Sequence, residues 1–255
     1  ADQGRVELLP GRVPFDREND MLVREIEALG ARDRLYPLAM IDPSRCVNEQ
    51  LRSLERLAGR ISGLKLQSTI IESPALNLLT SGRELLEFAA ERQLPVLLHV
   101  TIWEQAPHAQ VVDCFAVAEA FPSIRFDLAH SLGFHVGHLR RAAQMPNVWV
   151  DCAALLAHCQ LVRDNSPIIA APTDRLDADY TRPAHVLEAI HAILGNRFLW
   201  GSDNPFMSWC DDHLRLLYSY AEEAAVLRML PDRVRADIGS VGPEAWLFGQ
   251  KGSAS

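Results

Sequence analysis

The sequence predicts a soluble α/β protein of the (β/α)-barrel class, and three features of its 255 residues support this fold. Short apolar runs alternate with longer segments in which apolar residues recur every three or four positions. Most of the short runs are apolar on both faces, as strands covered by helices require. Several of these runs also end at an ionisable residue. With 48% hydrophobic residues one core is expected, so we interpret residues 1–255 as a single domain.

Six strands, separated by helices, are predicted in chain order. The stretch 163–182, rich in Asp, Pro and Ala, is predicted to form a loop over one end of the barrel. Two helices are predicted to follow Ser81 and Pro183, and the other helices cover 21–29, 48–58, 110–120, 136–143 and 213–227. The strands cover 35–41, 63–66, 95–99, 124–130, 148–151 and 197–203.

Local signals predict where three of the helices begin. Asn19 and Asp20 are predicted to cap the first helix, because their side chains accept hydrogen bonds from the N–H groups of a first turn. Ser81 and Glu84 have the spacing of a capping box. Pro183 suits a first helical position, where its missing N–H has no intrahelical partner to lose.

Composition and motifs exclude several classes of function. A net charge of −8, with no Lys- and Arg-rich run, argues against nucleic acid as a partner. No stretch approaches the roughly 18 apolar residues of a membrane span. The first residues lack the layout of a signal peptide, and five dispersed cysteines indicate reduced thiols, so a cytoplasmic protein is expected. Motifs for dinucleotides, nucleotide phosphates and serine hydrolases are absent.

Ionisable residues at the strand ends form the candidate site. His99, His130, Asp151 and Asp203 each end a predicted strand, and Asp42 follows the first one. In a parallel barrel all carboxyl ends of the strands lie on one rim, where barrel enzymes keep their active sites. Imidazole and carboxylate are ligands for zinc and similar divalent metals, which lower the pKa of a bound water. The sequence therefore predicts a site at this rim, with a small molecule as its substrate.

Each of these residues also has a structural interpretation. A His at a strand end often hydrogen-bonds to loop backbone, but His99 and His130 end consecutive strands in the same register, which favours a functional role for both. Asp203 could cap a following helix or turn, although a site role is favoured. For Asp42 capping is favoured instead. For Asp151 a hydrogen bond at the rim and a site role are equally compatible with the sequence.

Four further polar or aromatic residues also have both a structural and a functional interpretation. His135 and His138 have the spacing of a metal pair, but a solvated helix start is the favoured interpretation. Lys65 lies inside a short apolar strand, where a charge needs a partner, so it is predicted to bind an anionic group of the substrate. Trp103, four residues after His99, either walls a pocket or packs.

Five segments, taken in order, resemble the amidohydrolase superfamily. The resemblance runs from about residue 21 to 248, and the G-S-D-x-P ending with its two upstream strand-terminal histidines is the specific feature. It is most similar to the branch typified by aminocarboxymuconate-semialdehyde decarboxylase and pyrone-dicarboxylate lactonase. The segments are Gly63-Leu64-Lys65-Leu66, 94–99 (LPVLLH), 129–133 (AHSLG), 147–151 (NVWVD) and 199–205 (LWGSDNP).

The resemblance implies a distorted (β/α)8 TIM-like barrel whose rim holds a divalent metal, zinc or alternatively manganese. His99 falls where the family has a metal-ligand His. His130 falls where it has a His that polarises the substrate or orients the metal-bound water. Asp203 falls where it has an Asp that binds the metal and shuttles a proton. These roles agree with the chemistry expected of the residues themselves.

One departure from the family is the missing start of the barrel. Family members begin with a strand carrying H-x-H, which supplies two metal ligands, and a second strand follows. No histidine precedes Met21, so the six predicted strands would be numbers three to eight, with open sheet edges. Three explanations of the missing strands compete. In the first, which we favour, the strands belong to a preceding segment outside this sequence. In the second a partner subunit supplies them, and in the third this member of the family has lost its metal. His99 and Asp203 alone are fewer than the three protein ligands of a usual catalytic zinc.

Three functional hypotheses follow. The leading one is a metal-dependent hydrolase or decarboxylase acting on a small carboxylated or cyclic compound. The second is a non-catalytic barrel that serves as a binding or scaffold protein. The third is a metal-independent hydrolase in which Asp203 and His130 perform the acid–base steps. A homodimer is the predicted assembly in each case, because acidic barrels with apolar rims often pair.

Overall fold

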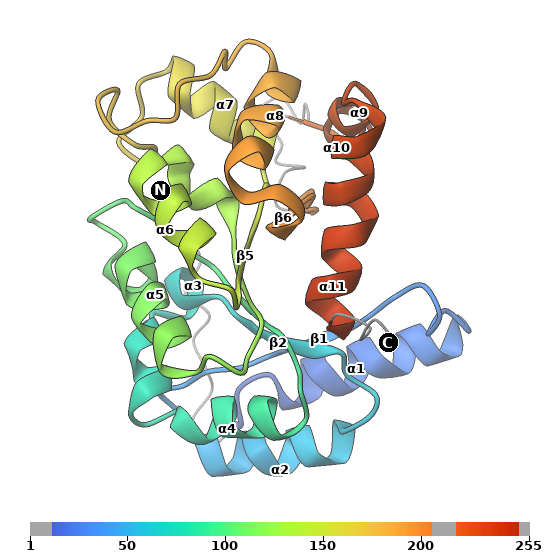
Figure 1. The fold of residues 1–255 in the computed structure, drawn as a ribbon. Helices are drawn as coiled ribbons and strands as arrows, with labels where there is room; N and C mark the ends of the chain where they lie inside the picture. The colour runs from blue at the N-terminus through green and yellow to red at the C-terminus, as the bar shows by residue number, and fades with distance from the viewer. Residues whose placement is uncertain (1–11, 206–217, 250–255) are drawn as a thin grey trace, which may run out of the picture. The chain divides into compact units, whose positions relative to one another are not determined.

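The chain folds into two units, each built from alternating strands and helices. A computed structural model describes residues 12–205 and 218–249. The first unit comprises residues 12–99 and 106–126, and the second comprises 100–105, 127–205 and 218–249. Within each unit the strand order follows the chain order (Figure 1). The α/β alternation predicted from the sequence is therefore confirmed, while the single-domain interpretation stays a prediction.

Parallel strands form the sheet of the first unit. Leu64 lies opposite Val96 in the register of β2 and β3. The ladder continues one residue beyond β3, because the N–H of His99 donates to the carbonyl oxygen of Leu66 at 2.9 Å. His99 is therefore held in strand geometry at the end of the sheet. The strands are β1 (Leu38–Met40), β2 (Gly63–Leu66) and β3 (Val96–Leu98).

The two faces of this sheet differ in burial. Leu64, Leu66 and Leu98 are fully buried, whereas Lys65 and Leu97 on the alternate face are half-buried. Successive strand side chains point to opposite faces, so one face carries the core and the other carries the residues that continue to His99. The helices of this unit are α1 (Asp16–Ala28), α2 (Val47–Leu57), α3 (Ser68–Ile71), α4 (Arg83–Glu91) and α5 (Val111–Ala120), with the short helices η1 (Ala75–Leu79) and η2 (Pro107–Ala109).

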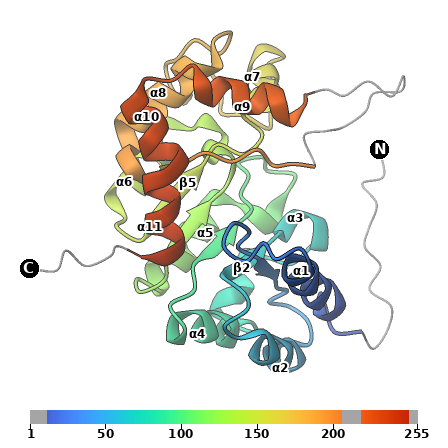
Figure 2. The ribbon, with the colours of Figure 1, turned by 90° about the vertical axis from the view of Figure 1, so that its right-hand side faces the viewer.

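The second unit contains the remaining strands and the C-terminal helices. Val150 pairs with Phe198 in the parallel register of β5 and β6, and the N–H of Cys152 donates to the carbonyl oxygen of Leu199 at 3.0 Å. Helices α6 and α8 pack against each other (Figure 2). The strands are β4 (Phe126–Leu128), which begins in the first unit, β5 (Val148–Asp151) and β6 (Phe198–Leu199). The helices are η3 (His130–Phe134), α6 (Val136–Gln144), α7 (Leu155–Arg163), α8 (Pro183–Leu194), η4 (Gly195–Arg197), α9 (Tyr220–Arg228), α10 (Asp232–Ala236), η5 (Asp237–Val241) and α11 (Gly242–Phe248).

Asn19 does not cap the first helix, which corrects the sequence-based prediction. Helix α1 begins at Asp16, so Asn19 and Asp20 lie inside it. The amide of Asn19 instead donates to the carbonyl oxygen of Met40 at 2.9 Å and accepts the Met40 N–H at 2.8 Å. An edge strand presents such unpaired backbone groups to solvent unless something covers them. The Asn19 amide therefore satisfies both backbone groups of Met40, its N–H and its C=O, at the edge of β1.

The predicted capping box at Ser81 and Glu84 is also wrong. Helix α4 begins at Arg83, its N-cap residue Gly82 offers no side chain, and the Ser81 hydroxyl donates to the carbonyl oxygen of Pro43 at 2.7 Å. The Ser81 hydroxyl therefore bonds to a residue distant in sequence and does not cap α4, as the local pattern predicted. The prediction that Pro183 begins a helix is confirmed by α8.

A capping box does occur at the start of α9. The Ser219 hydroxyl accepts the Glu222 N–H at 3.3 Å, and the Glu222 carboxylate accepts the Ser219 N–H at 2.7 Å. The helix predicted over 213–227 therefore begins later, at Tyr220, and the predicted start at residue 213 lies outside the described residues.

The loop predicted over 163–182 is present between α7 and α8, and it is tied down by its backbone. The N–H of Ala170 donates to the carbonyl oxygen of Gly133 at 3.0 Å, and the N–H of Leu176 donates to that of Phe134 at 2.9 Å. The buried Tyr180 ring packs on Phe134, with ring centroids 5.1 Å apart. The loop is thereby anchored to the segment that directly follows His130.

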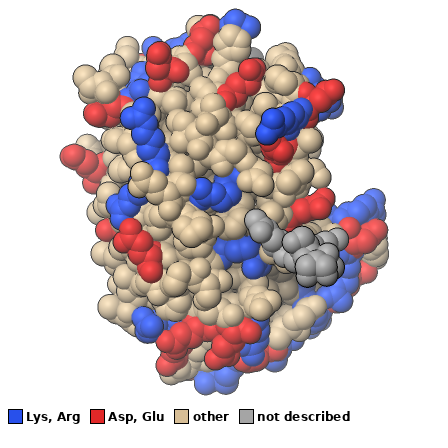
Figure 3. All heavy atoms as spheres, in the orientation of Figure 1, with Lys and Arg blue, Asp and Glu red and all other residues tan. Residues whose placement is uncertain are grey.

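The surface shows mixed charge. Lys and Arg side chains are interspersed with Asp and Glu on the face drawn in Figure 3. Opposite charges near one another weaken the long-range field that a nucleic-acid partner would need. Among the helices of the described ranges, none has the length and apolar character needed to cross a membrane.

Candidate active site

In the first unit, His99 is held by residues at the end of the neighbouring strand. Its N–H bonds to the carbonyl oxygen of Leu66, and its ring nitrogen Nδ1 lies 3.3 Å from the amide nitrogen Nε2 of Gln67. Gln67 directly follows β2, so both contacts come from adjacent residues of one strand end. Because Gln67 holds Nδ1, Nε2 is the ring nitrogen turned away from this contact.

Lys65 lies on the same sheet face as Gln67, two residues earlier in the strand. It stands in register with Met40 of β1 and Leu97 of β3, and all three side chains are half-buried. Lys65 therefore lies on the sheet face opposite to that of the buried Leu64 and Leu66. Its role in binding an anionic group stays a prediction.

Trp103 belongs to the short stretch 100–105 of the second unit. It is half-buried, and its backbone N–H donates to the hydroxyl of Thr101 at 3.0 Å. The hydroxyl bond fixes the local turn that carries the indole. Whether Trp103 contributes to a pocket wall stays a prediction.

In the second unit, the buried His130 ring has a defined tautomer. Its Nδ1 lies 3.1 Å from the carbonyl oxygen of Ala153. A carbonyl oxygen can only accept a hydrogen bond, so Nδ1 carries the proton. Nε2 of the neutral ring is consequently the basic nitrogen, which can accept a proton or bind an electrophile.

Asp151 holds the backbone around His130 in place. Its Oδ1 accepts the N–H of His130 at 2.9 Å and the N–H of Ala153 at 2.8 Å. The side chain is buried, and both bonds hold loop backbone. Of the two interpretations left open by the sequence, the structure therefore supports the hydrogen bond at the rim.

The chain after β4 adopts an unusual left-handed turn. Five consecutive residues have positive φ angles, although only Gly133 can adopt them without steric cost. For residues with a Cβ this conformation costs roughly 1–2 kcal/mol each. The hydrogen bonds to Asp151 and the anchored loop help to hold the turn, which sets the direction of the His130 ring. The residues are His130 (65°), Ser131 (50°), Leu132 (50°), Gly133 (62°) and Phe134 (60°).

Asp203 follows β6 by four residues and is half-buried. The chain leading to it passes close to Ala153, because a Cβ added at Gly201 would lie 3.4 Å from the Cβ of Ala153. The same Ala153 carbonyl binds the His130 ring. Ala153 therefore contacts both the His130 ring and the segment that leads to Asp203. The residues that Asp203 could cap in a following helix or turn lie outside the described residues.

Glu223 is a polar residue near Asp203 that the sequence did not reveal as a candidate. It lies in the first turn of α9 and is fully buried. Its Oε1 accepts the N–H of Leu156 at 3.0 Å, while its Oε2 is buried without a hydrogen-bond partner. Burial, and to a smaller extent the charge of Asp203, raises the pKa of Glu223 to about 7. Its position beside Glu222 in an ordinary capping pattern carries no signal of burial.

His158 packs edge-on against His130, with ring centroids 5.3 Å apart. Burial, with a smaller contribution from the charge of His130, lowers the pKa of His158 to about 3. His158 is therefore neutral near pH 7 and packs against the His130 ring.

His135 and His138 form a helix cap rather than a metal pair. Nδ1 of His135 accepts the N–H of His138 at 3.3 Å, which caps α6, and the rings stack with centroids 4.0 Å apart. Burial, with smaller contributions from His135 and Arg141, lowers the pKa of His138 to about 4. The favoured interpretation as a helix start is confirmed.

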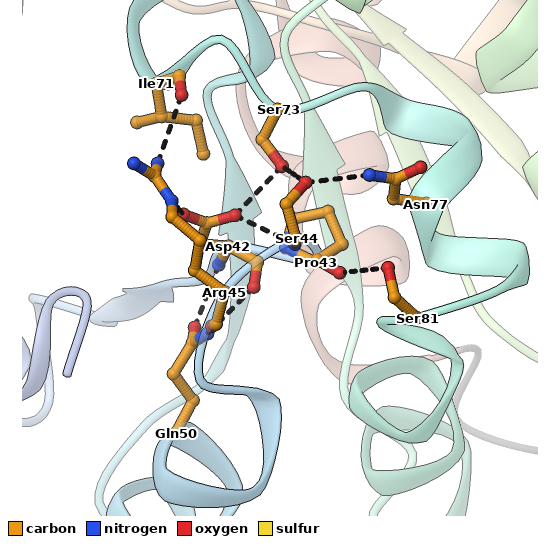
Figure 4. A network of polar contacts seen from close by, with 9 residues as sticks. All are labelled: Asp42, Pro43, Ser44, Arg45, Gln50, Ile71, Ser73, Asn77 and Ser81. Carbon is orange, nitrogen blue, oxygen red and sulfur yellow. Dashed lines mark hydrogen bonds and ion pairs between the residues drawn. The ribbon is translucent and has the colours of Figure 1, made fainter.

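Asp42 organises the turn that follows β1 (Figure 4). The fully buried carboxylate accepts the N–H of Ser44 and the hydroxyl of Ser73, each at 2.9 Å, and pairs with Arg45. Gln50 accepts the N–H of Asp42 at 2.9 Å and donates to its carbonyl oxygen at 2.8 Å. Every contact serves the turn, which confirms the capping role favoured from the sequence.

Comparison with known proteins places the chain in a family. A family model described as amidohydrolase matches residues 12–247. The chain belongs to the amidohydrolase family. No curated protein matches this amidohydrolase by sequence. Membership makes it an enzyme of the hydrolase and carboxy-lyase type, as its sequence predicted.

Solved structures confirm the TIM-barrel-like fold of this amidohydrolase. An amidohydrolase from Burkholderia multivorans with bound zinc shares 16% identity and a TM-score of 0.61, over 91% of this chain and 79% of that chain. Dihydroorotase from Campylobacter jejuni shares 12% identity and a TM-score of 0.59, over 89% and 70%. A manganese complex of 5-carboxyvanillate decarboxylase from Novosphingobium aromaticivorans shares 12% identity and a TM-score of 0.56, over 91% and 69%.

Amidohydrolases typically bind a divalent metal, and the residues of this one suit such an ion in chemical kind. Imidazole and carboxylate are its usual protein ligands. A ligand His usually donates its second ring N–H to an acceptor, whereas the Gln67 amide nitrogen, itself a donor, lies against Nδ1 of His99. The number of candidate ligands is too small, because the described residues contain no group of three or more His, Cys, Asp or Glu that could hold a metal. His99 is found in the first unit, and His130, Asp203 and Glu223 are found in the second.

Proposed function

We propose that this amidohydrolase is a metal-dependent hydrolase or decarboxylase that acts on a small carboxylated or cyclic compound. The observation that carries the proposal is the tautomer of His130. Its Nδ1 proton is engaged by Ala153, so that Nε2 is the ring nitrogen that can accept a proton, and Gly201, two residues before Asp203, passes close to the same Ala153. A basic imidazole and a carboxylate form the minimal acid–base pair for either reaction.

The two side chains take different roles in this proposal. His130 accepts a proton at Nε2 and, once protonated, stabilises negative charge that develops on a substrate oxygen. In hydrolysis the Asp203 carboxylate takes a proton from the attacking water and passes it to the leaving group, and in decarboxylation the protonated form of Asp203 delivers its proton to the carbon that loses carbon dioxide. His158 stays neutral beside His130, so it adds no positive charge that would oppose protonation of the neighbouring ring.

The proposed metal ligands are His99 and Asp203. The ion, when bound, supplies a Lewis acid that polarises the substrate and lowers the pKa of a bound water. Zinc is the expected ion and manganese the alternative, since structures of similar fold are described with each of them. Lys65 is proposed to bind a carboxylate of the substrate, because a lysine ammonium is a compact positive charge. Trp103 is proposed to wall the substrate pocket.

A metal-independent hydrolase is the second candidate. It is favoured by the absence of a three-ligand cluster from the described part of the chain. In this candidate Asp203 and His130 would act on the substrate without an ion, and the fully buried Glu223 would hold a proton close to Asp203.

Metal content and turnover together test the two candidates. The purified protein is analysed for bound zinc and manganese, then assayed on a panel of aromatic carboxylates and lactones before and after chelator treatment. About one ion per chain, with turnover that a chelator abolishes and the ion restores, supports the leading proposal. Turnover that survives metal removal supports the second candidate. A metal-free protein without turnover, even after reconstitution, contradicts both.

A further inference from the structure

A hollow in the second unit lies where β5 and β6 begin. Its volume is about 310 Å³, at the lower end of the range for small-molecule sites. Trp149 of β5 and Arg197 of η4, which directly precedes β6, both line it. The end of α6, the turn after it and α11 complete the lining. His130 and Asp203 instead follow the carboxyl ends of strands, so the hollow is separate from the proposed acid–base pair.

The fold uses one edge of the Arg197 guanidinium. Its Nη1 donates to the carbonyl oxygens of Ala142 and Val148, each at 3.0 Å, and to that of Met145. Its Nη2 donates to the carbonyl oxygen of Ala143 at 2.5 Å. These bonds hold the end of α6 and the turn to β5. Nε–H takes part in none of them, so the edge formed by Nε–H and the second Nη2 hydrogen is left over.

The positive charge of Arg197 has no carboxylate partner among the described residues. Its hydrogen bonds there all go to main-chain carbonyl oxygens. Burial lowers the pKa of Arg197 from its ordinary value, because the charge is partly removed from water. An anion stabilises a half-buried charge of this kind, and a guanidinium edge binds a carboxylate through two parallel hydrogen bonds.

Trp149 adds an unsatisfied donor to the lining of the hollow. The side chain is 7% exposed, and its indole Nε1 is buried without a hydrogen-bond partner among the described residues. A buried polar group without a partner is rare and destabilising, so it calls for an explanation. An acceptor atom of a bound molecule would satisfy this N–H, and the indole ring offers an apolar surface to the rest of that molecule.

We propose that this hollow binds a small carboxylate with an apolar body. The carboxylate takes the remaining edge of the Arg197 guanidinium, one of its oxygens accepts the indole N–H of Trp149, and the apolar body packs against the indole ring. The described residues that line the hollow include no Asp or Glu, so none of them repels the ligand. This inference does not depend on the proposed function, because it uses a different end of the strands.

The first test titrates benzoate into ¹⁵N-labelled protein and follows the indole N–H signal of Trp149, which is assigned by its absence from Trp149→Phe. We expect this signal to shift to saturation with benzoate and to stay in place with benzamide, which has a similar shape but no charge. His130→Asn should respond to benzoate as the wild type does. An unmoved Trp149 signal would overturn the inference. Loss of the shift in His130→Asn would also overturn it, since the shift would then arise from the proposed acid–base pair.

The second test compares the affinity for benzoate between variants, with thermal melting as the check of folding. Arg197→Lys keeps the charge but not the two-bonded edge, so it should bind benzoate about 10-fold more weakly, as expected for the loss of one charge-assisted hydrogen bond. Arg140→Lys, at an exposed position of α6 outside the hollow, is the matched control and should bind as wild type. Equal affinity of wild type and folded Arg197→Lys would contradict the inference.

A further variant covers the case in which Arg197→Lys does not fold, since Arg197 also holds the end of α6. Asn196→Asp places a carboxylate at an exposed position of the lining and leaves the Arg197 side chain intact. The new charge competes for the guanidinium and repels the ligand, so benzoate should bind more weakly than to the wild type. Wild-type affinity in Asn196→Asp would likewise contradict the inference.

Discussion

His130 donates its Nδ1 proton to the carbonyl oxygen of Ala153, 3.1 Å away, and Gly201 passes close to the same alanine. Ala153 is in turn fixed by Asp151, which accepts its N–H at 2.8 Å. The ring of the proposed base is therefore oriented by a main-chain carbonyl, and the Asp151 side chain holds the backbone that carries this carbonyl.

The first prediction concerns the base itself. Replacing His130 with Asn should lower kcat about 10²–10⁴-fold, because the variant lacks a group that accepts a proton. His108→Asn, which changes a half-buried histidine of η2 in the first unit, should keep wild-type kcat. Steady-state kinetics with the substrate found in the panel, together with thermal melting curves, provide the measurement. A folded His130→Asn variant with wild-type kcat would remove His130 from the proposed mechanism.

The second prediction concerns the carboxylate that supports the His130 turn. Asp151→Ala should lower the free energy of unfolding by about 2–5 kcal/mol, since two buried N–H groups lose their acceptor. Asp151→Asn keeps an acceptor oxygen and should cost less. Asp177→Ala, at an exposed loop position, should be neutral. Urea unfolding of the three variants gives the comparison, and equal stability of Asp151→Ala and Asp177→Ala would contradict the assigned role.

The third prediction concerns pH. The folded pKa of Glu223 is raised from its ordinary 4.5 to about 7, so between these values the unfolded chain ionises while the folded protein keeps the proton. The free energy of unfolding should therefore fall as pH rises from about 4.5 to 7, by up to about 3 kcal/mol from this group.

Glu223→Gln is the matched variant for this pH effect, because it keeps an oxygen for the Leu156 N–H but cannot ionise. Its stability relative to wild type should increase between pH 5 and pH 8. Urea unfolding at both pH values measures the difference. If the two proteins differ by the same amount at both pH values, Glu223 does not titrate in this window.

The fourth prediction concerns the edge of β1. Asn19→Ala should destabilise the protein by about 1–3 kcal/mol, because the N–H and C=O of Met40 both lose the amide that binds them. Asn48→Ala, at an exposed position of α2, serves as the control and should be near neutral. Light scattering would also report self-association through the uncovered strand edge. Similar stability and mass of the two variants would argue against this role.

Much of the fold could be predicted from local sequence. The strands at 63–66 and 148–151 were predicted to the residue. In an α/β protein, a short continuous apolar run bounded by turns and polar residues usually forms a buried parallel strand. The helix caps failed where a distant partner decided the outcome. Asn19 bonds to a residue 21 positions away, and Ser81 bonds to one 38 positions away. No local pattern contains that information.

Some residues of the candidate site could likewise be predicted from the sequence, and others could not. His99, His130 and Asp203 could be named because they stand at strand ends, where the barrel fold concentrates its chemistry. Gln67 and Glu223 could not, since neither residue type nor spacing reveals that Gln67 touches an imidazole or that Glu223 is buried. Likewise, a left-handed turn over residues 130–134 contradicts the ordinary preferences of four of its five residues.

The backbone anchoring of the loop between α7 and α8 has a consequence for engineering this protein. Residues 170 and 176 hold the loop to residues 133 and 134 through main-chain atoms, which every amino acid except proline provides at the donor position. The path of the loop is thus largely independent of which side chains it displays. Randomising its exposed positions, such as Thr173 and Asp177, offers a library in which recognition can be altered while the scaffold persists.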